Sequence, residues 1–168
     1  YSVETEAGEI VSCVMRGKKG GVACGDQVEC QLTTAGQGVI ETIKPRKSLL
    51  YRSDAFKEKI IAANVTQIII VVAAVPSFSE ELINRCFVAV ESENIEVLIV
   101  LNKADLAAST QAAMSILSLY RDLGYPVLQL SALKNVSALR PYLTGHLSVL
   151  AGQSGMGKST LLNALIPQ

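Results

Sequence analysis

The pattern of apolar and polar positions changes near residue 45. Before that point, short alternations of apolar and polar residues are cut by glycine-rich stretches, which predicts short β-strands joined by turns. Four strands are expected, over residues 1–5, 9–16, 27–33 and 39–43. Strands of this length and spacing favour a small barrel of the OB-fold type, which has one strand more. We therefore expect an OB-fold-like β domain over residues 1–46 that lacks its first strand.

From residue 67 onward, continuous apolar runs alternate with stretches of helical periodicity. The apolar runs at 68–75, 97–101, 127–130 and 147–151 predict buried strands, and 79–92, 110–123 and the residues from 158 predict helices. Strands that alternate with helices predict an open parallel sheet of the α/β class over residues 67–168. Pro45 marks a boundary because proline stops strand pairing, and we expect a linker over residues 47–66.

Composition narrows the possible partners and the location. The 168 residues include 49% hydrophobic and 5% aromatic side chains, and 15 Lys+Arg balance 15 Asp+Glu. A net charge of zero removes bulk attraction to nucleic acid, so any such contact must come from local basic patches. The longest apolar run, 68–75, is far shorter than the roughly 20 residues that span a bilayer. Without a basic and apolar leader at Tyr1, we expect a cytoplasmic protein with no membrane partner.

Four cysteines and one histidine offer little for metal chemistry. The cysteines are not spaced in C-x-x-C pairs, so we expect reduced, mostly buried thiols and no zinc site made from them. They are Cys13, Cys24, Cys30 and Cys86. The single histidine, His146, precedes an expected strand and is interpreted as a surface or strand-end residue.

One glycine-rich stretch predicts phosphate binding. It fits G-x-x-x-x-G-K-[ST] at every fixed position and lies between an apolar strand and a helix, the context in which backbone N–H groups and a helix N-terminus cradle phosphates. Lys158 is expected to reach the β- and γ-phosphates as the catalytic lysine, and Ser159 to bind Mg²⁺ through its hydroxyl. The nucleotide-binding candidates here are Gly152, Gln153, Ser154, Gly155, Met156, Gly157, Lys158, Ser159 and Thr160.

A second motif predicts recognition of the base. Asn102, Lys103, Ala104 and Asp105 follow a strand directly, at the edge of a parallel sheet where ligands bind. The Asp105 carboxylate can accept two hydrogen bonds from guanine N1–H and its exocyclic amine, a pair that adenine does not offer. Taken alone, this tetrapeptide is equally consistent with a loop in which Asp105 caps the following helix.

A third strand end completes the pattern. Ser131 and Ala132 follow the expected strand 127–130, where a backbone N–H can contact a base carbonyl. This dipeptide is weak evidence alone. Three neighbouring strand ends that carry a phosphate loop, a base-reading acid and a second base contact together predict a guanine-nucleotide site, with GTP or GDP and Mg²⁺ as ligands.

The order of the motifs points to a family. In ordinary GTPases the P-loop comes first, whereas here it follows N-K-A-D and Ser-Ala, so the motifs are circularly permuted. With the preceding β unit and the stretches 100–106 and 151–163, the chain resembles the ribosome small subunit-dependent GTPases of bacteria. The resemblance implies a permuted, here incomplete, P-loop GTPase domain of the α/β class behind an OB-fold. It also implies a GTP hydrolase that acts late in maturation of the small (30S) ribosomal subunit.

The resemblance also implies parts that are not in this sequence. Family members carry switch segments after the P-loop helix and a C-terminal zinc-binding domain, which would both follow Gln168. The resemblance therefore indicates a chain truncated after the P-loop, with zinc only in the parent protein. Because phosphoryl transfer needs a positioned water and charge neutralisation, we expect these 168 residues to hydrolyse GTP weakly or not at all.

Basic side chains near the β unit are candidates for ribosomal RNA contact. Composition alone favours solvated loops neutralised by nearby glutamates, and the family resemblance favours RNA contact through the OB-fold. The candidates are Arg16, Lys18, Lys19, Lys44, Arg46, Lys47 and Arg52. We expect a monomer whose partners are the small subunit and its RNA. The alternative is a non-catalytic RNA-binding or assembly module in which nucleotide is a structural ligand.

Overall fold

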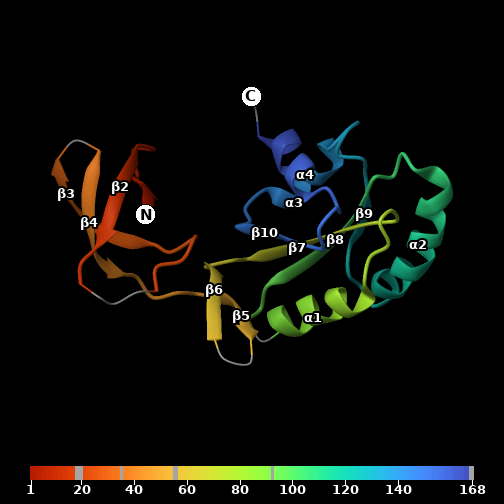
Figure 1. The fold of residues 1–168 in the computed structure, drawn as a ribbon, viewed down its shortest axis with the longest axis horizontal. Helices are drawn as coiled ribbons and strands as arrows, with labels where there is room; N and C mark the ends of the chain where they lie inside the picture. The colour runs from red at the N-terminus through yellow and green to blue at the C-terminus, as the bar shows by residue number, and fades with distance from the viewer. Residues whose placement is uncertain (18–20, 35, 55–56, 92, 167–168) are drawn as a thin grey trace. The chain divides into compact units, whose positions relative to one another are not determined.

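The computed structural model describes residues 1–17, 21–34, 36–54, 57–91 and 93–166. For residues 52–54 and 57–58 only the backbone is described. These residues form two compact units, Tyr1–Asn64 and Val65–Gln168 (Figure 1). The division lies at the end of the segment expected as a linker and not at its start. Each unit has its own sheet and its own hydrophobic core.

The first unit contains a four-stranded sheet made by the expected strands. In chain order they are β1 (Ser2–Glu4), β2 (Ile10–Met15), β3 (Val28–Thr34) and β4 (Gln37–Ile43). The spatial order is β1-β2-β4-β3, in which β2 and β4 are parallel and the other pairs antiparallel. Val11, Cys13 and Ile40 form its buried core.

The segment expected as a linker is structured. Two antiparallel strands, β5 (Leu49–Asp54) and β6 (Lys57–Ala63), occupy most of residues 47–66. The hairpin is attached to the first unit by hydrogen bonds from Ala63 N to Cys24 O and from Asn64 Nδ2 to Gly25 O, both 2.9 Å long. Leu50, Ala62 and Ala63 are buried, so this hairpin belongs to the packed unit.

The second unit is the open parallel sheet predicted from the sequence. Its strands are β7 (Gln67–Ala73), β8 (Glu96–Asn102), β9 (Val127–Gln129) and β10 (Ser148–Ala151), all parallel, in the order β10-β7-β8-β9. All seven residues of β7 are buried, which explains the continuous apolar run of a strand covered on both faces.

Helices cover both faces of this sheet (Figure 1). One face packs against α1 (Glu80–Glu91) and α2 (Ala107–Asp122). The other carries the 3₁₀ turn η1 (Ser137–Leu139), α3 (Arg140–Leu143) and α4 (Lys158–Leu165), and its core joins Ile69 and Val71 of β7 to Leu139 and Leu161. Because β-strand side chains alternate between faces, Ile68 and Ile70 point to the opposite side. Because all four strands are parallel, the loops after β7, β8, β9 and β10 meet at one edge of the sheet.

Candidate functional site

The glycine-rich loop connects β10 to α4 at the carboxyl edge of the sheet. Gly152, Gly155 and Gly157 have φ angles of +143°, +81° and +87°, values that favour glycine. A Cβ on Gly152 would overlap the main-chain oxygen of Val71, and a Cβ on Gly157 would overlap the amide nitrogen of Asn102. The glycines are thus required by backbone conformation and by close approach, as the P-loop motif predicts.

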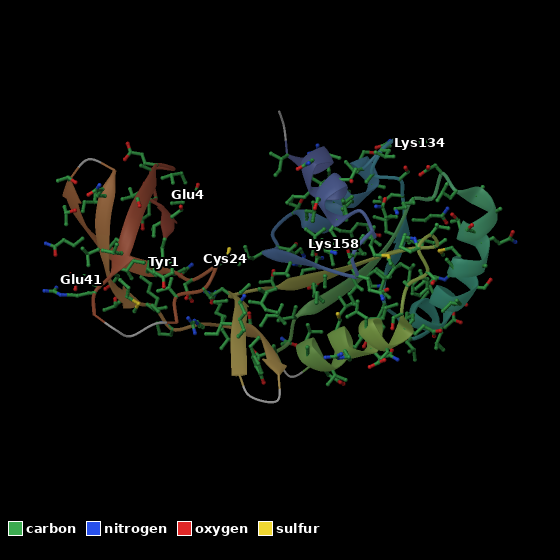
Figure 2. The ribbon with its side chains drawn as sticks, viewed as in Figure 1. Tyr1, Glu4, Cys24, Glu41, Lys134 and Lys158 are labelled. Atoms are coloured by element: carbon green, nitrogen blue, oxygen red, sulfur yellow. The ribbon has the colours of Figure 1, made fainter. Side chains whose placement is uncertain are left out.

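The loop wraps around the ammonium group of Lys158. Lys158 Nζ donates hydrogen bonds to the main-chain oxygens of Gly152 at 2.8 Å and Gln153 at 2.7 Å. The lysine lies at the first residue of α4, so its cation and the positive end of the helix face the same space (Figure 2). Ser159 and Thr160 follow in the first turn of α4 and are exposed. This geometry suits an anion with several oxygens.

Asn102 joins three loops of the site. Its Nδ2 donates to the main-chain oxygen of Met156 at 2.9 Å, and its Oδ1 accepts from the main-chain N–H of Ala132 at 2.9 Å. Asn102 is 2% exposed, so both hydrogen bonds are shielded from water. The motif after β8 therefore fixes the positions of the phosphate loop and of the Ser-Ala step after β9. The sequence predicted this proximity from the shared edge of the sheet.

The base-recognition motif borders a cavity of about 270 Å³. Lys103 and Asp105 line it together with Ser131 and Ala132, and Gly157 and Thr160 line it on the side of the glycine-rich loop. The helix after this motif starts at Ala107 with Leu106 as the preceding residue, and no side chain bonds its first N–H groups. Asp105 is therefore not the helix cap, and its exposed carboxylate faces the cavity with free acceptor capacity.

The environment of Asp105 favours its charged form. The Ser131 hydroxyl is the main cause that lowers the pKa of Asp105, followed by a backbone N–H and the charges of Lys134 and Lys103. Ser131 Oγ is buried and makes no hydrogen bond of standard geometry within the described residues. Its influence on Asp105 is accordingly that of a nearby dipole. A carboxylate held ionised is the acceptor that two guanine N–H donors need.

A fourth loop, after β7, was not recognised in the sequence. Ser79 donates from its main-chain N–H to Gln153 Oε1 at 2.9 Å, and Lys103 Nζ donates to the main-chain oxygen of Val75 at 2.9 Å. A Cβ on Gly155 would lie 3.3 Å from Pro76 Cγ, so this loop also touches the phosphate loop. The available signal was its position: β7 lies between β10 and β8, so the loop after it must lie between their motifs.

The basic candidates for RNA contact have separate environments. Arg46 makes a bidentate pair with the buried Asp26 carboxylate, with both N–O distances 2.7 Å, and also donates to the main-chain oxygen of Gly21. Arg16 makes an exposed pair with Glu41 at 2.8 Å. Lys44 and Lys47 are exposed. Two further candidates, Lys18 and Lys19, lie outside the described residues, as does the side chain of Arg52.

The single histidine and the four cysteines do not contribute to the site at the carboxyl edge of the sheet. His146 precedes β10 at the opposite edge of the sheet, with Nδ1 3.3 Å from Thr66 Oγ1 and Nε2 3.9 Å from Glu96. This confirms the strand-end interpretation. All four cysteines are free thiols. Within the described residues, no group of three His, Cys, Asp or Glu side chains could hold a metal ion, and no helix is long and apolar enough to span a membrane.

Comparison with known proteins gives consistent matches. The family described as RsgA GTPase matches residues 43–168. The small ribosomal subunit biogenesis GTPase RsgA of Nitrosospira multiformis is 60% identical over 167 residues, which are 99% of this chain and 53% of that protein. The protein of the same name from Nitrosomonas europaea is 55% identical over 171 residues, 100% of this chain and 54% of that protein. The chain thus spans about half the length of the curated relatives it matches.

Two solved structures have a similar fold. YjeQ from Thermotoga maritima aligns with a TM-score of 0.78 and 35% identity, covering 99% of this chain and 60% of that one. YloQ, described as a circularly permuted GTPase, aligns with a TM-score of 0.70 and 31% identity, covering 97% of this chain and 59% of its own. The permuted order of motifs expected from the sequence agrees with this likeness.

Proposed function

Because this chain belongs to the RsgA GTPase family, we propose that it binds GTP, and that a longer protein containing these residues hydrolyses GTP in the biogenesis of the small ribosomal subunit. The nucleotide lies at the carboxyl edge of the β10-β7-β8-β9 sheet. The observation that carries this proposal is the position of Asn102, whose amide joins the phosphate loop to the Ser-Ala step beside the Asp105 cavity. A phosphate site and a base site are thereby held in one fixed arrangement.

The phosphate half of the site works through exchange of hydrogen-bond partners. Lys158 Nζ now donates to two main-chain oxygens of its own loop, which are neutral acceptors. Phosphate oxygens carry full charge, so their hydrogen bonds to the ammonium are stronger, and Lys158 would turn toward them. The N–H groups at the start of α4 add donors that point at the same anion.

The residues present fit Mg²⁺ bound with the nucleotide. Ser159 offers a hydroxyl oxygen on the first turn of α4, which is exposed and has no hydrogen-bond partner within the described part of the chain. Mg²⁺ prefers oxygen ligands and is usually held by one or two protein oxygens, phosphates and water. When bound, the ion would neutralise charge on the phosphates, and Ser159 would be its protein ligand.

The base half of the site supplies specificity. The Asp105 carboxylate would accept the N1–H and the exocyclic amine of guanine, while the methylene stem of Lys103 covers the base. Adenine has no N1–H and would leave the carboxylate without its partners. Sites built on such polar pairing reject the wrong ligand by about 10⁴ or more.

Nucleotide-dependent stability tests this proposal. Thermal unfolding of the chain with Mg²⁺ and either GDP or ADP is expected to show stabilisation by GDP alone, about 2.7 kcal/mol at a hundredfold excess over Kd. Asp105→Ala should remove the difference between the two nucleotides without unfolding the protein, because this side chain is exposed. Equal stabilisation by ADP, or none by GDP, would contradict the proposal.

Turnover distinguishes the enzyme from an assembly module. We propose weak or absent hydrolysis by these 168 residues, since Lys158 and Ser159 bind phosphate and metal but do not position the attacking water. Turnover by the full-length protein, stimulated by small subunits, supports the GTPase. GDP binding without turnover in that protein would favour the non-catalytic module. The OB-fold-like architecture of the first unit and its contact with ribosomal RNA are part of the same proposal.

A further inference from the structure

Charge is segregated along the second unit. Residues 80–122 carry seven acidic and three basic side chains, whereas residues 123–168 contain no Asp or Glu. The cations in that last segment are Lys134, Arg140 and Lys158. The first stretch contains α1 and α2, and the second contains η1, α3, β10 and α4 on the other face of the sheet. The segment 123–168 therefore carries cations without an acidic side chain of its own, whereas acidic side chains outnumber basic ones in the segment before it.

Two of these cations line a second cavity, which shares Ala132 and Leu133 with the cavity beside Asp105. Its volume is about 410 Å³, and it lies between the loop after β9 and α4. Lys134, Asn135, Ser137 and Arg140 line it with polar side chains, and Ala164 closes it from α4. Figure 2 labels Lys134 in this loop. A cation, an amide, a hydroxyl and a guanidinium thus border one open space.

The loop that carries these groups is held firmly from within. The main-chain N–H groups of Lys134 and Asn135 both donate to Ser131 O, at 3.0 and 2.9 Å, and Asn135 Oδ1 accepts from Ser137 N at 2.7 Å. Val136 and Leu139 are buried in the core beneath the loop. The cations are consequently presented from a fixed backbone, which reduces the entropy lost when a ligand binds.

Among the described residues, the cations at the cavity make no close pair with a carboxylate, although the charge of Lys134 contributes to the lowered pKa of Asp105. Within the described part of the chain, neither the Arg140 guanidinium nor the Lys134 ammonium makes a hydrogen bond or an ion pair within 4.0 Å. Arg16 and Arg46 differ, because each forms a bidentate pair with a carboxylate. The two cations at the cavity therefore remain available to an external anion.

We propose that this cavity binds the phosphate backbone of RNA. An arginine with a lysine, an amide and a hydroxyl is the set of donors that contacts phosphate and sugar oxygens in nucleic-acid complexes. A protein partner would need a larger apolar centre than this cavity offers, since Leu133 is its one large exposed apolar side chain among the lining residues. The proposal rests on the proposed role at the ribosomal subunit, and it adds a contact in the second unit.

Charge reversal at Arg140 tests the proposal. The wild-type chain is expected to bind a short fluorescent RNA hairpin with an affinity that falls with salt. Arg140→Glu should weaken this binding several-fold and reduce the salt slope by about one, equally for hairpins of different sequence. Arg121→Glu is the matched control, because Arg121 is an exposed arginine in the last turn of α2, on the other face of the sheet.

The outcomes separate this proposal from the proposed function. Thermal unfolding with GDP checks that each variant folds, and Arg140→Gln replaces Arg140→Glu if the latter does not. Absence of hairpin binding by the wild type, or equal losses in Arg140→Glu and Arg121→Glu, would overturn the RNA site while leaving GDP stabilisation intact. Loss of subunit binding with unchanged hairpin binding would show an acidic protein partner and also overturn it. Absence of GDP stabilisation with a selective Arg140→Glu effect would overturn the nucleotide site alone.

Discussion

Asn102 donates a 2.9 Å hydrogen bond from its side-chain amide to the main-chain oxygen of Met156, 54 residues further along the chain. The same side chain accepts from Ala132 N, so one buried amide determines how the phosphate loop and the base loop face each other. Close packing supports the bond, because Gly157 leaves no Cβ where the Asn102 nitrogen lies.

Asn102→Ala is expected to lower both the free energy of unfolding and the affinity for GDP. The change leaves Met156 O and Ala132 N buried without partners, at about 1–3 kcal/mol for each group. Urea unfolding with and without GDP measures both effects. Thr110→Val is the control: Thr110 is also buried, but among the described residues its hydroxyl bonds only the main-chain oxygen of Leu106, the residue just before its own helix. It should lose stability without losing GDP discrimination. Equal effects of the two variants on GDP binding would refute the linking role of Asn102.

Gly157→Ala is expected to destabilise the protein more than Gly124→Ala does. Both glycines have positive φ, +87° and +93°, so each substitution carries the left-handed cost of about 1–2 kcal/mol. A Cβ on Gly124 meets open space, whereas one on Gly157 overlaps the Asn102 amide. The additional loss of stability in Gly157→Ala, relative to Gly124→Ala, measures that overlap. Only Gly157→Ala should also impair GDP binding. Thermal unfolding of the two variants in parallel gives the comparison, and similar shifts in Tm would mean that Asn102 can move aside.

Gln153 is expected to link the phosphate loop to the start of α1. Gln153→Ala removes the acceptor of Ser79 N and should lower the free energy of unfolding by about 0.5–1.5 kcal/mol. Gln153→Glu retains an acceptor and adds a negative charge near a helix N-terminus, which restores stability. The same charge repels phosphate, so Gln153→Glu should bind GDP more weakly than Gln153→Ala. Chemical denaturation and GDP titration separate the two effects, and tighter GDP binding by Gln153→Glu would contradict this role.

The geometry of the glycine-rich loop and of the three strand ends could be predicted from the sequence because the signals for it are local. A P-loop needs glycines at fixed spacing before a helix, and the parallel sheet brings strand ends together, so the meeting of Asn102 with Met156 follows from topology. The contact of Ser79 with Gln153 could not be predicted, since it joins positions 74 residues apart through a main-chain N–H that has no sequence signature. Only the folded arrangement of four loops reveals it.

Two features of the first unit depend on partners that are distant in the sequence. Pro45 indicated a linker over residues 47–66, but cross-strand pairing and burial of Leu50 and Ala63 stabilise a hairpin there. Arg46 was a candidate for RNA contact because of its charge, and the structure adds that Asp26, 20 residues earlier, binds its guanidinium. In both places a residue is held by a partner elsewhere in the chain. Composition records the charge of such a residue and not its partner.

The Asp26–Arg46 pair is expected to make the first unit sensitive to acid. Hydrogen bonding from Arg46 is the main cause that lowers the pKa of Asp26, and a backbone N–H from Ala23 lowers it further, against the opposing effect of burial. In the unfolded chain the Asp26 carboxyl has a pKa of about 3.9. As the pH falls through this value, the unfolded chain therefore binds more protons than the folded one. The stability from this pair is fully present above about pH 4 and is lost as pH falls through the lowered pKa.

Asp26→Asn is therefore expected to reduce the free energy of unfolding at neutral pH by about 1.5–3 kcal/mol, the range for hydrogen bonds to charged groups. Because the stabilising charge disappears in acid, the difference between wild type and Asp26→Asn should shrink as the pH falls below about 4. Glu41→Gln is the matched control: its pair with Arg16 also has two hydrogen bonds, but the Arg16 side chain is 71% exposed, so water weakens the attraction and a much smaller loss of stability is expected. Urea unfolding across the acid range measures both variants. A difference for Asp26→Asn that stays constant with pH would show that shape, and not the ionised carboxylate, makes this contact stabilising.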